Sequence, residues 1–346
     1  MPIISIPNSP KATGGDVRTI HLSGTNYVMH VFEKSGFFTV PADITGCTVL
    51  VVGGGGGGGA SHGDNDTGKG GGGAGGVLFR NNFTIADATY MCGVGRGGYH
   101  PLQRGTEPMT GDYRAGGWTH SGMNGFDTHF VDESSNALID VYALGGGGGG
   151  GGDNNGAAMQ GGCGGGAGAR NSTADWNLGA SGIQPSFSNW TRAYAAGGDS
   201  ANGNYCGAGG GGAGSNGGNH SGSVNYGTAG NGGTGIDYSS YFGTDVGDRG
   251  WFAGGGGGGV YRKGSWSYAI QGWGGKGGGG NGMFGEETSD GNEWRQNKID
   301  GVDGTGGGGG GSSEDAIGVA PNKNAARRGC NVGTGGGGVI IIRYAQ

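Results

Sequence analysis

The sequence has little charge, little proline and no long apolar run, and each scarcity excludes a class of protein. Of its 346 residues, 13% are charged and 8 are proline. Collagen needs abundant proline and glycine at every third position, so the chain is not collagen-like. No apolar run approaches the roughly 18 residues of a membrane helix. No basic run is longer than Arg327–Arg328. We therefore expect neither membrane insertion nor binding to nucleic acid.

Cysteine is also sparse and scattered. The 5 cysteines are Cys47, Cys92, Cys163, Cys206 and Cys330, without CxxC spacing. This pattern fits free thiols from a reducing cytoplasm better than a disulfide scaffold or a zinc site. The start, MPIISIPNSP, lacks a basic segment followed by an apolar stretch, so we expect no secretory signal.

Catalytic and cofactor motifs are missing as well. The stretch CTVLVVGGGGGGGA at 47–60 could begin a dinucleotide-binding unit, but the glycine-rich segment after it cannot form the required helix. No Gly-Lys-Ser/Thr follows a glycine loop, and no histidine lies in a hydrolase signature. We expect no enzyme, no cofactor and no metal. One enzymatic alternative stays open, because the paired carboxylates of a glycosidase need only meet in space.

Glycine is what the chain has in excess. There are 99 glycines, yet aromatic residues make up 9% and the net charge is only −6, which argues against a disordered chain. Short apolar and β-branched runs predict strands at 17–23, 27–33, 36–40, 47–52, 77–85, 89–94, 127–132, 137–144 and 339–344. No long amphipathic helix competes with them. The pattern predicts an all-β fold, an antiparallel β-sandwich or jelly roll.

Between the strands lie glycine tracts of similar length. They occupy 53–59, 70–76, 145–152, 161–168, 207–214, 254–259, 274–280, 304–311 and 333–338, with weaker tracts at 195–203 and 227–235. Flexible linkers have no reason to share a length, whereas rods in a bundle do. We predict a polyglycine-II bundle, in which each extended threefold rod touches up to six neighbours and a Cβ would push the rods apart. The alanines Ala74, Ala167 and Ala213 would then mark outer or less crowded positions.

These runs predict two structural parts. Residues 1–144 plus 339–346 form the β-sandwich, which includes a first polyglycine hairpin at 53–76. Residues 145–338 form the bundle with its aromatic loops. Ordering glycine is costly in entropy, so the sandwich and the loops must clamp the tract ends.

Counting crossings predicts which loops lie far from the sandwich. The chain leaves the sandwich at 145 and returns at 339, which requires an even number of crossings, so only one weak tract is a full rod. Either choice places loops 60–69, 153–160, 260–273 and 312–332 at the far end, and 281–303 beside the sandwich.

One far-end loop concentrates aromatic residues beside a cation. The loop VYRKGSWSYAIQGW contains the candidate receptor-binding residues Tyr261, Arg262, Trp266, Tyr268 and Trp273. Amphipathic rings suit sugar faces or protein epitopes. Alternatively, these rings cap the rods. The oxygen-rich segments 62–68 and 151–156 suggest calcium ligands, although Asx-rich turns explain them more simply.

Three stretches of the sequence resemble a known family. YVMHVFEKSGFFTVPADITGCTVLVVGGGGGGG (27–59), GGGGAGGVL (70–78) and GTGGGGVIIIRY (333–344) resemble the glycine-rich domain common in bacteriophage tail-fibre and virion proteins. The middle of the chain matches only by its glycine tracts. A related arrangement, a TNF-like jelly roll with an inserted polyglycine-II bundle, occurs in the extracellular part of anaplastic lymphoma kinase. Tip adhesins of T-even-like phages similarly display host-binding loops on such bundles.

The resemblance implies a structural virion protein, made in the host cytoplasm. It would be a tail-fibre or surface adhesin, with a purely structural role in capsid decoration or at a fibre joint as the first alternative. A bacterial surface or matrix protein is a second alternative. The implied partners are other virion proteins and a host surface glycan or outer-membrane protein, with the chain assembled as a homotrimer.

Overall fold

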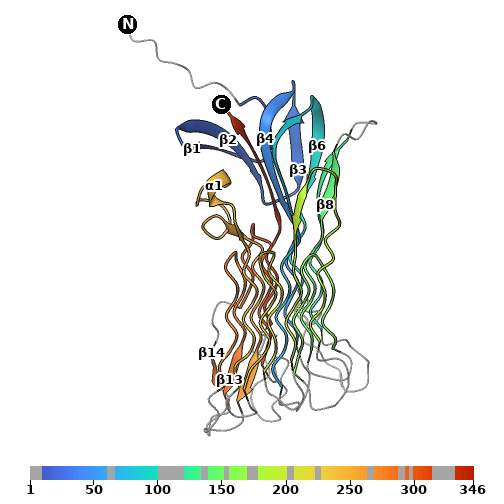
Figure 1. Ribbon diagram of the computed structural model, residues 1–346, viewed down its shortest axis with the longest axis vertical. Coiled ribbons are helices and arrows are strands. Elements are labelled where there is room, and N and C mark those ends of the chain that lie inside the picture. Colours follow the sequence, from blue (N-terminus) through green and yellow to red (C-terminus); the bar gives the residue numbers. More distant parts are fainter. Residues whose placement is uncertain are drawn as a thin grey trace, which may run out of the picture.

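The structure is a computed structural model that describes most of the chain. The described residues are 10–60, 67–99, 121–133, 139–151, 156–169, 178–200, 206–222, 227–262, 269–286, 293–295, 299–313 and 332–346. A β-sandwich forms one end of the molecule and a bundle of extended segments forms the other (Figure 1). In the described part of the chain the only helix is α1 (Ser239–Phe242). The predicted all-β fold without a long helix is confirmed for these residues.

Two antiparallel sheets make up the sandwich. The larger sheet has the order β1 (Asp16–Leu22), β2 (Thr25–Phe32), β15 (Val339–Ala345), β4 (Ile44–Val52), β5 (Val77–Ile85) and β9 (Thr191–Ala193). The smaller sheet has the order β3 (Gly36–Val40), β6 (Ala88–Gly93), β7 (Thr128–Asp132) and β8 (Asp140–Ala143). β15 lies between β2 and β4, so the last strand of the chain completes the sheet that the first strands begin.

The main core lies between the two sheets. Phe38, Tyr90 and Phe130 come from three neighbouring strands of the smaller sheet, and all three side chains are fully buried. Tyr90 stacks on Phe130 with 5.2 Å between ring centroids. Side chains alternate between faces along a strand, so a shift of one residue in register would turn these rings outward. The core thereby fixes the pairing of the strands.

His30 is buried in the same core. Its Nδ1 lies 2.7 Å from the Gly14 carbonyl oxygen and its Nε2 lies 3.0 Å from the Tyr344 hydroxyl. Because a carbonyl only accepts, Nδ1 carries the proton and Nε2 accepts from the hydroxyl of Tyr344. Burial lowers the pKa of His30, and the hydrogen bond to Gly14 opposes this only in part. The imidazole is therefore held neutral.

The folded protein should lose stability as the pH falls below about 6.5. His30 has its pKa lowered in the folded state, so the unfolded chain takes up this proton first and the free energy of unfolding decreases. The loss is complete once the pH is below the folded pKa. Urea unfolding at about pH 7.5 and about pH 5 should show a larger loss for the wild type than for His30→Gln. Equal losses would assign the acid sensitivity to other groups.

A second apolar cluster covers the outer face of the larger sheet. Leu50, Val52 and Ile341 are fully buried there, beneath the segment 236–252. This segment contains β10 (Ile236–Asp237), α1 and β11 (Trp251–Phe252). Phe79 of β5 stacks on Tyr238 at 4.9 Å and contacts Tyr241 at 4.8 Å, measured between ring centroids. The sandwich thus has a third layer supplied by a loop of the bundle.

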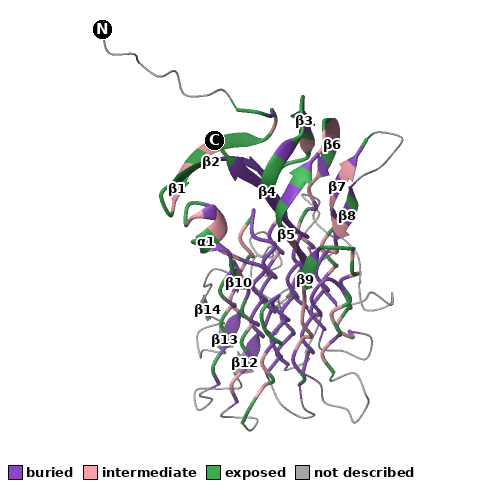
Figure 2. Cartoon of the chain, turned by 45° about the horizontal axis from the view of Figure 1, so that its top comes forward, coloured by how far each residue is buried: buried purple, intermediate pink, exposed green. Residues whose placement is uncertain are grey.

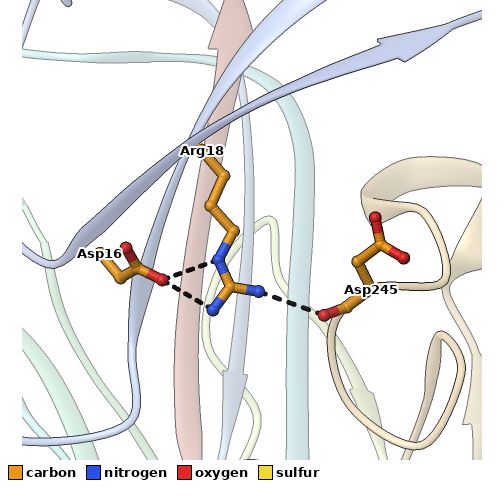
Figure 3. A network of polar contacts seen from close by, with 3 residues as sticks. All are labelled: Asp16, Arg18 and Asp245. Atoms are coloured by element: carbon orange, nitrogen blue, oxygen red, sulfur yellow. Dashed lines mark hydrogen bonds and ion pairs between the residues drawn. The ribbon is translucent and has the colours of Figure 1, made fainter.

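Two arginines hold this segment to the larger sheet. Arg18 binds the carboxylate of Asp16 at 2.7 Å and donates from Nη1 to the Asp245 carbonyl oxygen at 3.1 Å (Figure 3). Arg343 donates from Nη1 to the Tyr241 carbonyl oxygen at 2.6 Å. Both bonds go to main-chain oxygens, so they fix the path of the segment rather than any one side chain.

The hydrogen bonds of the tract 53–59 repeat every three residues. Successive amides donate to three different segments in turn and then return to the first. The bonds are Gly53 N to Gly76 O, Gly54 N to Phe126 O, Gly55 N to Gly336 O, Gly56 N to Gly73 O, Gly57 N to Met123 O, Gly58 N to Gly333 O and Gly59 N to Gly70 O. A period of three residues is the signature of an extended threefold helix. The tract is a polyglycine-II rod.

Each central rod has six neighbours. In the rod 53–59, the amides donate to rods 67–76, 121–127 and 332–338. The carbonyls of the same rod accept from rods 94–99, 144–151 and 307–313. The interior of the bundle is almost entirely buried (Figure 2). The remaining rods are 156–161, 163–169, 178–184, 194–200, 206–213, 215–222, 227–235, 253–259, 269–275, 278–283 and 299–303. Both weak tracts contribute rods, so the prediction that only one does so was wrong.

We had predicted that the alanines mark outer or less crowded positions, and the outer placement is wrong. Ala74 and Ala167 are fully buried, and Ala213 is nearly so. Ala74 and Ala213 belong to the apolar cluster beneath the larger sheet, together with Leu50 and Val52. Side chains of the sandwich core reach the tops of these rods, and the small methyl groups pack against them.

Residues 284–286 and 293–295 of the segment 281–303 lie at the far end of the bundle (Figure 1), whereas we had predicted the segment beside the sandwich. Its β13 (Phe284–Glu286) pairs in parallel with β12 (Val260–Arg262) at the end remote from the sandwich (Figure 1). The count of crossings missed two tight reversals near the sandwich. Gly277, Gly278, Gly304 and Gly306, all with positive φ, make these reversals.

The two predicted parts exchange segments across their boundary. β9, from the range assigned to the bundle, pairs with β5 of the larger sheet. Rods 94–99 and 121–127, from the range assigned to the sandwich, are hydrogen-bonded into the bundle. The sandwich and bundle therefore share strands and rods, which supports the expectation that they clamp each other.

At the edge of the bundle, side-chain oxygens replace the carbonyls of a missing rod. Asp127 Oδ1 accepts from the Gly145 amide at 2.8 Å, and Asn124 Oδ1 accepts from the Gly148 amide at 2.9 Å. The two acceptors are three residues apart, as the threefold helix requires. The same spacing recurs in Asp300 with Asp303 and in Asn216 with Asn219.

Removing one of these acceptors should leave a partly buried amide unpaired. We expect Asp127→Ala to lower the free energy of unfolding by about 1–2 kcal/mol. Asp127→Asn keeps the accepting oxygen and should lower it by less than half as much. Urea unfolding measures both variants, and hydrogen exchange at the Gly145 amide should accelerate only in the alanine variant. Equal losses would assign the effect to the charge.

Candidate functional site

The far end of the bundle carries a small sheet of its own. Its order is β12-β13-β14, with β14 (Glu293–Arg295) antiparallel to β13. Buried apolar side chains support it, because Cys206, Ala229, Val260, Ala269 and Phe284 form one cluster. The rods thus hold an ordered surface remote from the sandwich.

Three of the five residues predicted to bind a receptor are described, and Trp273 lies apart from Tyr261 and Arg262. Tyr261 and Arg262 lie in β12, opposite Gly285 and Glu286 of β13. Trp266 and Tyr268 lie outside the described residues. Trp273 lies on the side of the bundle, and not at its tip. Only the backbone positions of Tyr261 and Arg262 therefore support the predicted far-end location.

Trp273 is part of a rod. The amides of Ile270 and Gly272 donate to carbonyl oxygens of Gly227 and Gly258, so the rod has already begun at these residues. We had placed residues 260–273 in one loop because glycine becomes continuous only after Trp273. An outer rod needs no glycine on its exposed edge, and the absence of glycine there does not end the rod.

Lysine and hydroxyl groups are buried near the far end. Lys69 is fully buried, and its Nζ donates to the carbonyl oxygen of Thr67 at 2.6 Å and also to the Thr67 hydroxyl. The Lys69 amide donates to the Ser312 carbonyl oxygen at 3.1 Å.

Lys69 directly follows the segment 62–68 that we considered for calcium. Residues 62–66 and 152–155 of the two oxygen-rich segments lie outside the described residues.

The described thiols are protected from reaction. Cys47, Cys92, Cys163 and Cys206 are free, as predicted, and they are buried, while Cys330 lies outside the described residues. Burial raises the pKa of Cys47 to about 11 and that of Cys163 and Cys206 to about 12. Burial raises the pKa of Cys92 as well. A thiol is nucleophilic as the thiolate, so these four side chains are inert at neutral pH.

No protein-family model matches the chain, and the search of curated proteins found no similar sequence. Among the described residues no group of three His, Cys, Asp or Glu side chains is arranged to hold a metal ion. The same residues contain no helix with the length and apolar character needed to cross a bilayer.

The side chains beside Trp273 were not among the residues that we predicted from the sequence. Ile270 and Lys276 lie three residues to either side of it on the chain, and Thr228, Asn231 and Thr234 have the same spacing on the adjacent rod. The sequence does contain a signal for this row. Residues other than glycine at every third position mark the outward edge of a threefold rod.

Proposed function

We propose that this chain is a non-enzymatic structural protein of a bacteriophage virion, a tail-fibre or surface adhesin. Its location in the virion and the far-end binding residues are part of the proposal. The observation that carries it is the bundle itself, which holds the β12-β13-β14 sheet away from the sandwich on rods joined by main-chain hydrogen bonds. A rigid support lowers the entropy lost on binding.

In this proposal the two ends of the molecule have different partners. The sandwich attaches the chain to other virion proteins and assembles it as a homotrimer. A host glycan or an outer-membrane protein is bound by Tyr261 and Arg262 of β12, by Trp266 and Tyr268, and by Trp273 on the side of the bundle.

A purely structural role is the second candidate, and one side of the bundle favours it. Phe126, Met159, Leu178 and Ile183 are between 38% and 62% exposed. Their rods are adjacent, since Asn124 donates to the Gln160 carbonyl oxygen and the Ile183 amide donates to the Gly161 carbonyl oxygen. Clustered exposed apolar side chains are typical of interaction surfaces. A capsid or fibre neighbour would cover this side.

Binding to intact cells distinguishes the two roles. The fluorescently labelled chain is incubated with a panel of Gram-negative strains and measured by flow cytometry, beside the triple variant Trp266→Ala, Tyr268→Ala, Trp273→Ala. An adhesin should bind at least one strain, and the triple variant should bind at least about tenfold less while keeping its urea midpoint. If the wild type binds no strain, the structural role replaces the adhesin. Unfolding of the variant would identify the rings as caps of the rods.

A further inference from the structure

One edge of the rod 269–275 and the turn after it is a row of exposed side chains. Ile270 is 52% exposed, Trp273 is 54% exposed and Lys276 is also exposed. Residues three apart on a threefold helix point to the same side. The row therefore presents an aliphatic group and an indole along one line, followed by Lys276, whose Nζ lies 5.3 Å from the centroid of the Trp251 ring.

The adjacent rod 227–235 presents a matching polar row. Asn231 and Thr234 are exposed and Thr228 is partly so. The two rods are parallel and in register, because Thr228 forms a bridge with Ile270 and the Trp273 amide donates to Asn231 Oδ1 at 2.8 Å. Thr228 and Asn231 thus lie beside Ile270 and Trp273, in pairs about 9 Å apart along the rods. The hydroxyl of Thr234 donates to Ser215 Oγ of the rod 215–222 at 3.2 Å.

This surface is held rigid by main-chain bonds on both sides of the indole. The Trp273 carbonyl oxygen accepts from the Gly232 amide at 2.8 Å. The amides of Gly272 and Gly275 donate to Gly258 and Gly255 at 2.9 and 2.8 Å. Tryptophan also has only two side-chain torsions, so little conformational entropy is lost when it is covered.

The polar and apolar side chains on this surface indicate which chemical class of ligand it binds. A protein interface has an apolar core, but here only Ile270 and Trp273 are apolar and the other four side chains carry hydroxyl, amide or ammonium groups. A sugar ring has an apolar C–H face, which stacks on an indole, and a rim of hydroxyls, which bond to amides and hydroxyls. We infer that the surface formed by Thr228, Asn231, Thr234, Ile270, Trp273 and Lys276 binds a glycan on the side of the bundle.

The inference rests on the proposed adhesin function and names its ligand class and location. The probe is an array of bacterial O-antigen and capsular oligosaccharides, incubated with the full labelled chain. Trp273→Ala should bind at least about tenfold less than the wild type. Asn231→Asp keeps the oxygen that accepts from the Trp273 amide but loses the amide donor, and should also bind less. Phe37→Ala is the matched control, because Phe37 is 55% exposed but lies on β3 in the sandwich.

Each outcome of the oligosaccharide-binding measurement either supports or overturns the proposed glycan surface. Binding that is lost in Trp273→Ala and kept in Phe37→Ala supports the glycan surface. Absence of wild-type binding to every oligosaccharide, or equal binding by Trp273→Ala, overturns it. The cell-binding assay distinguishes a wrong glycan site from a wrong adhesin function. If cells are bound equally by wild type and Trp273→Ala, the adhesin remains and its site lies elsewhere, whereas absence of cell binding rejects the adhesin itself.

Discussion

Gly72→Ala should disrupt the bundle and lower the free energy of unfolding by more than about 3 kcal/mol. Gly72 lies in a rod with neighbours on all sides, donating to Gly309 at 2.8 Å and accepting from Gly256 at 2.9 Å. A Cβ there would lie 2.2 Å from the carbonyl oxygen of Gly56. That atom is main chain in another rod, and it cannot move without breaking further bonds. Urea unfolding followed by tryptophan fluorescence measures the loss.

Gly93→Ala is the matched control for this prediction. Gly93 ends β6, just before the rod 94–99, and its φ is not positive. The nearest atom to an added Cβ is the His129 Cβ at 3.6 Å, an ordinary contact. We expect a change of less than about 0.5 kcal/mol. If Gly72→Ala were as mild as Gly93→Ala, close packing of bare Cα atoms would not be what requires glycine in the rods.

Gln184→Leu should weaken the junction between sandwich and bundle by about 3 kcal/mol. Gln184 is fully buried where β8 passes into a rod. Its Oε1 accepts from the Leu144 amide at 2.8 Å, and its Nε2 donates to the Tyr142 carbonyl oxygen at 3.0 Å. The side chain thus replaces a main-chain partner on both sides of the transition. Leucine has a similar size but leaves both groups buried and unpaired.

Gln160→Leu provides the comparison at an exposed position. The Gln160 side chain is exposed, and the bond that involves this residue uses its carbonyl oxygen, which accepts from Asn124. Its stability should stay within about 0.5 kcal/mol of the wild type. Thermal unfolding of the two variants should therefore differ clearly. Similar midpoints would show that water or a shifted backbone satisfies Leu144 and Tyr142 without the glutamine.

The longer strands and the innermost rods could be predicted, because their signal lies in a few consecutive residues. The strand runs are short and either alternating or continuously apolar, and each of the nine predicted strands has a counterpart in the sandwich. The tracts at 53–59 and 70–76 could be recognised as rods because glycine is needed at nearly every position where six chains meet. Short strands such as β9 and β12 were missed, since two or three residues carry no periodic signal.

The order in which the chain passes through the rods of the bundle could not be predicted from the sequence. Gly277 and Gly304 turn the chain with positive φ, whereas Gly72 lies in an extended rod, and all three are simply glycine in the sequence. The position of Trp273 depends on that route.

The sequence by itself determined that glycine tracts of similar length would pack as threefold rods beneath an antiparallel β-sandwich. This was possible because the need for a bare Cα is a property of each residue. Only the tertiary structure decided which rods are neighbours, which amides Asp127 and Asn124 satisfy, and which side chains stand beside Trp273. These features depend on contacts between segments far apart in the chain, and glycine, without a side chain, carries no local information about its partner.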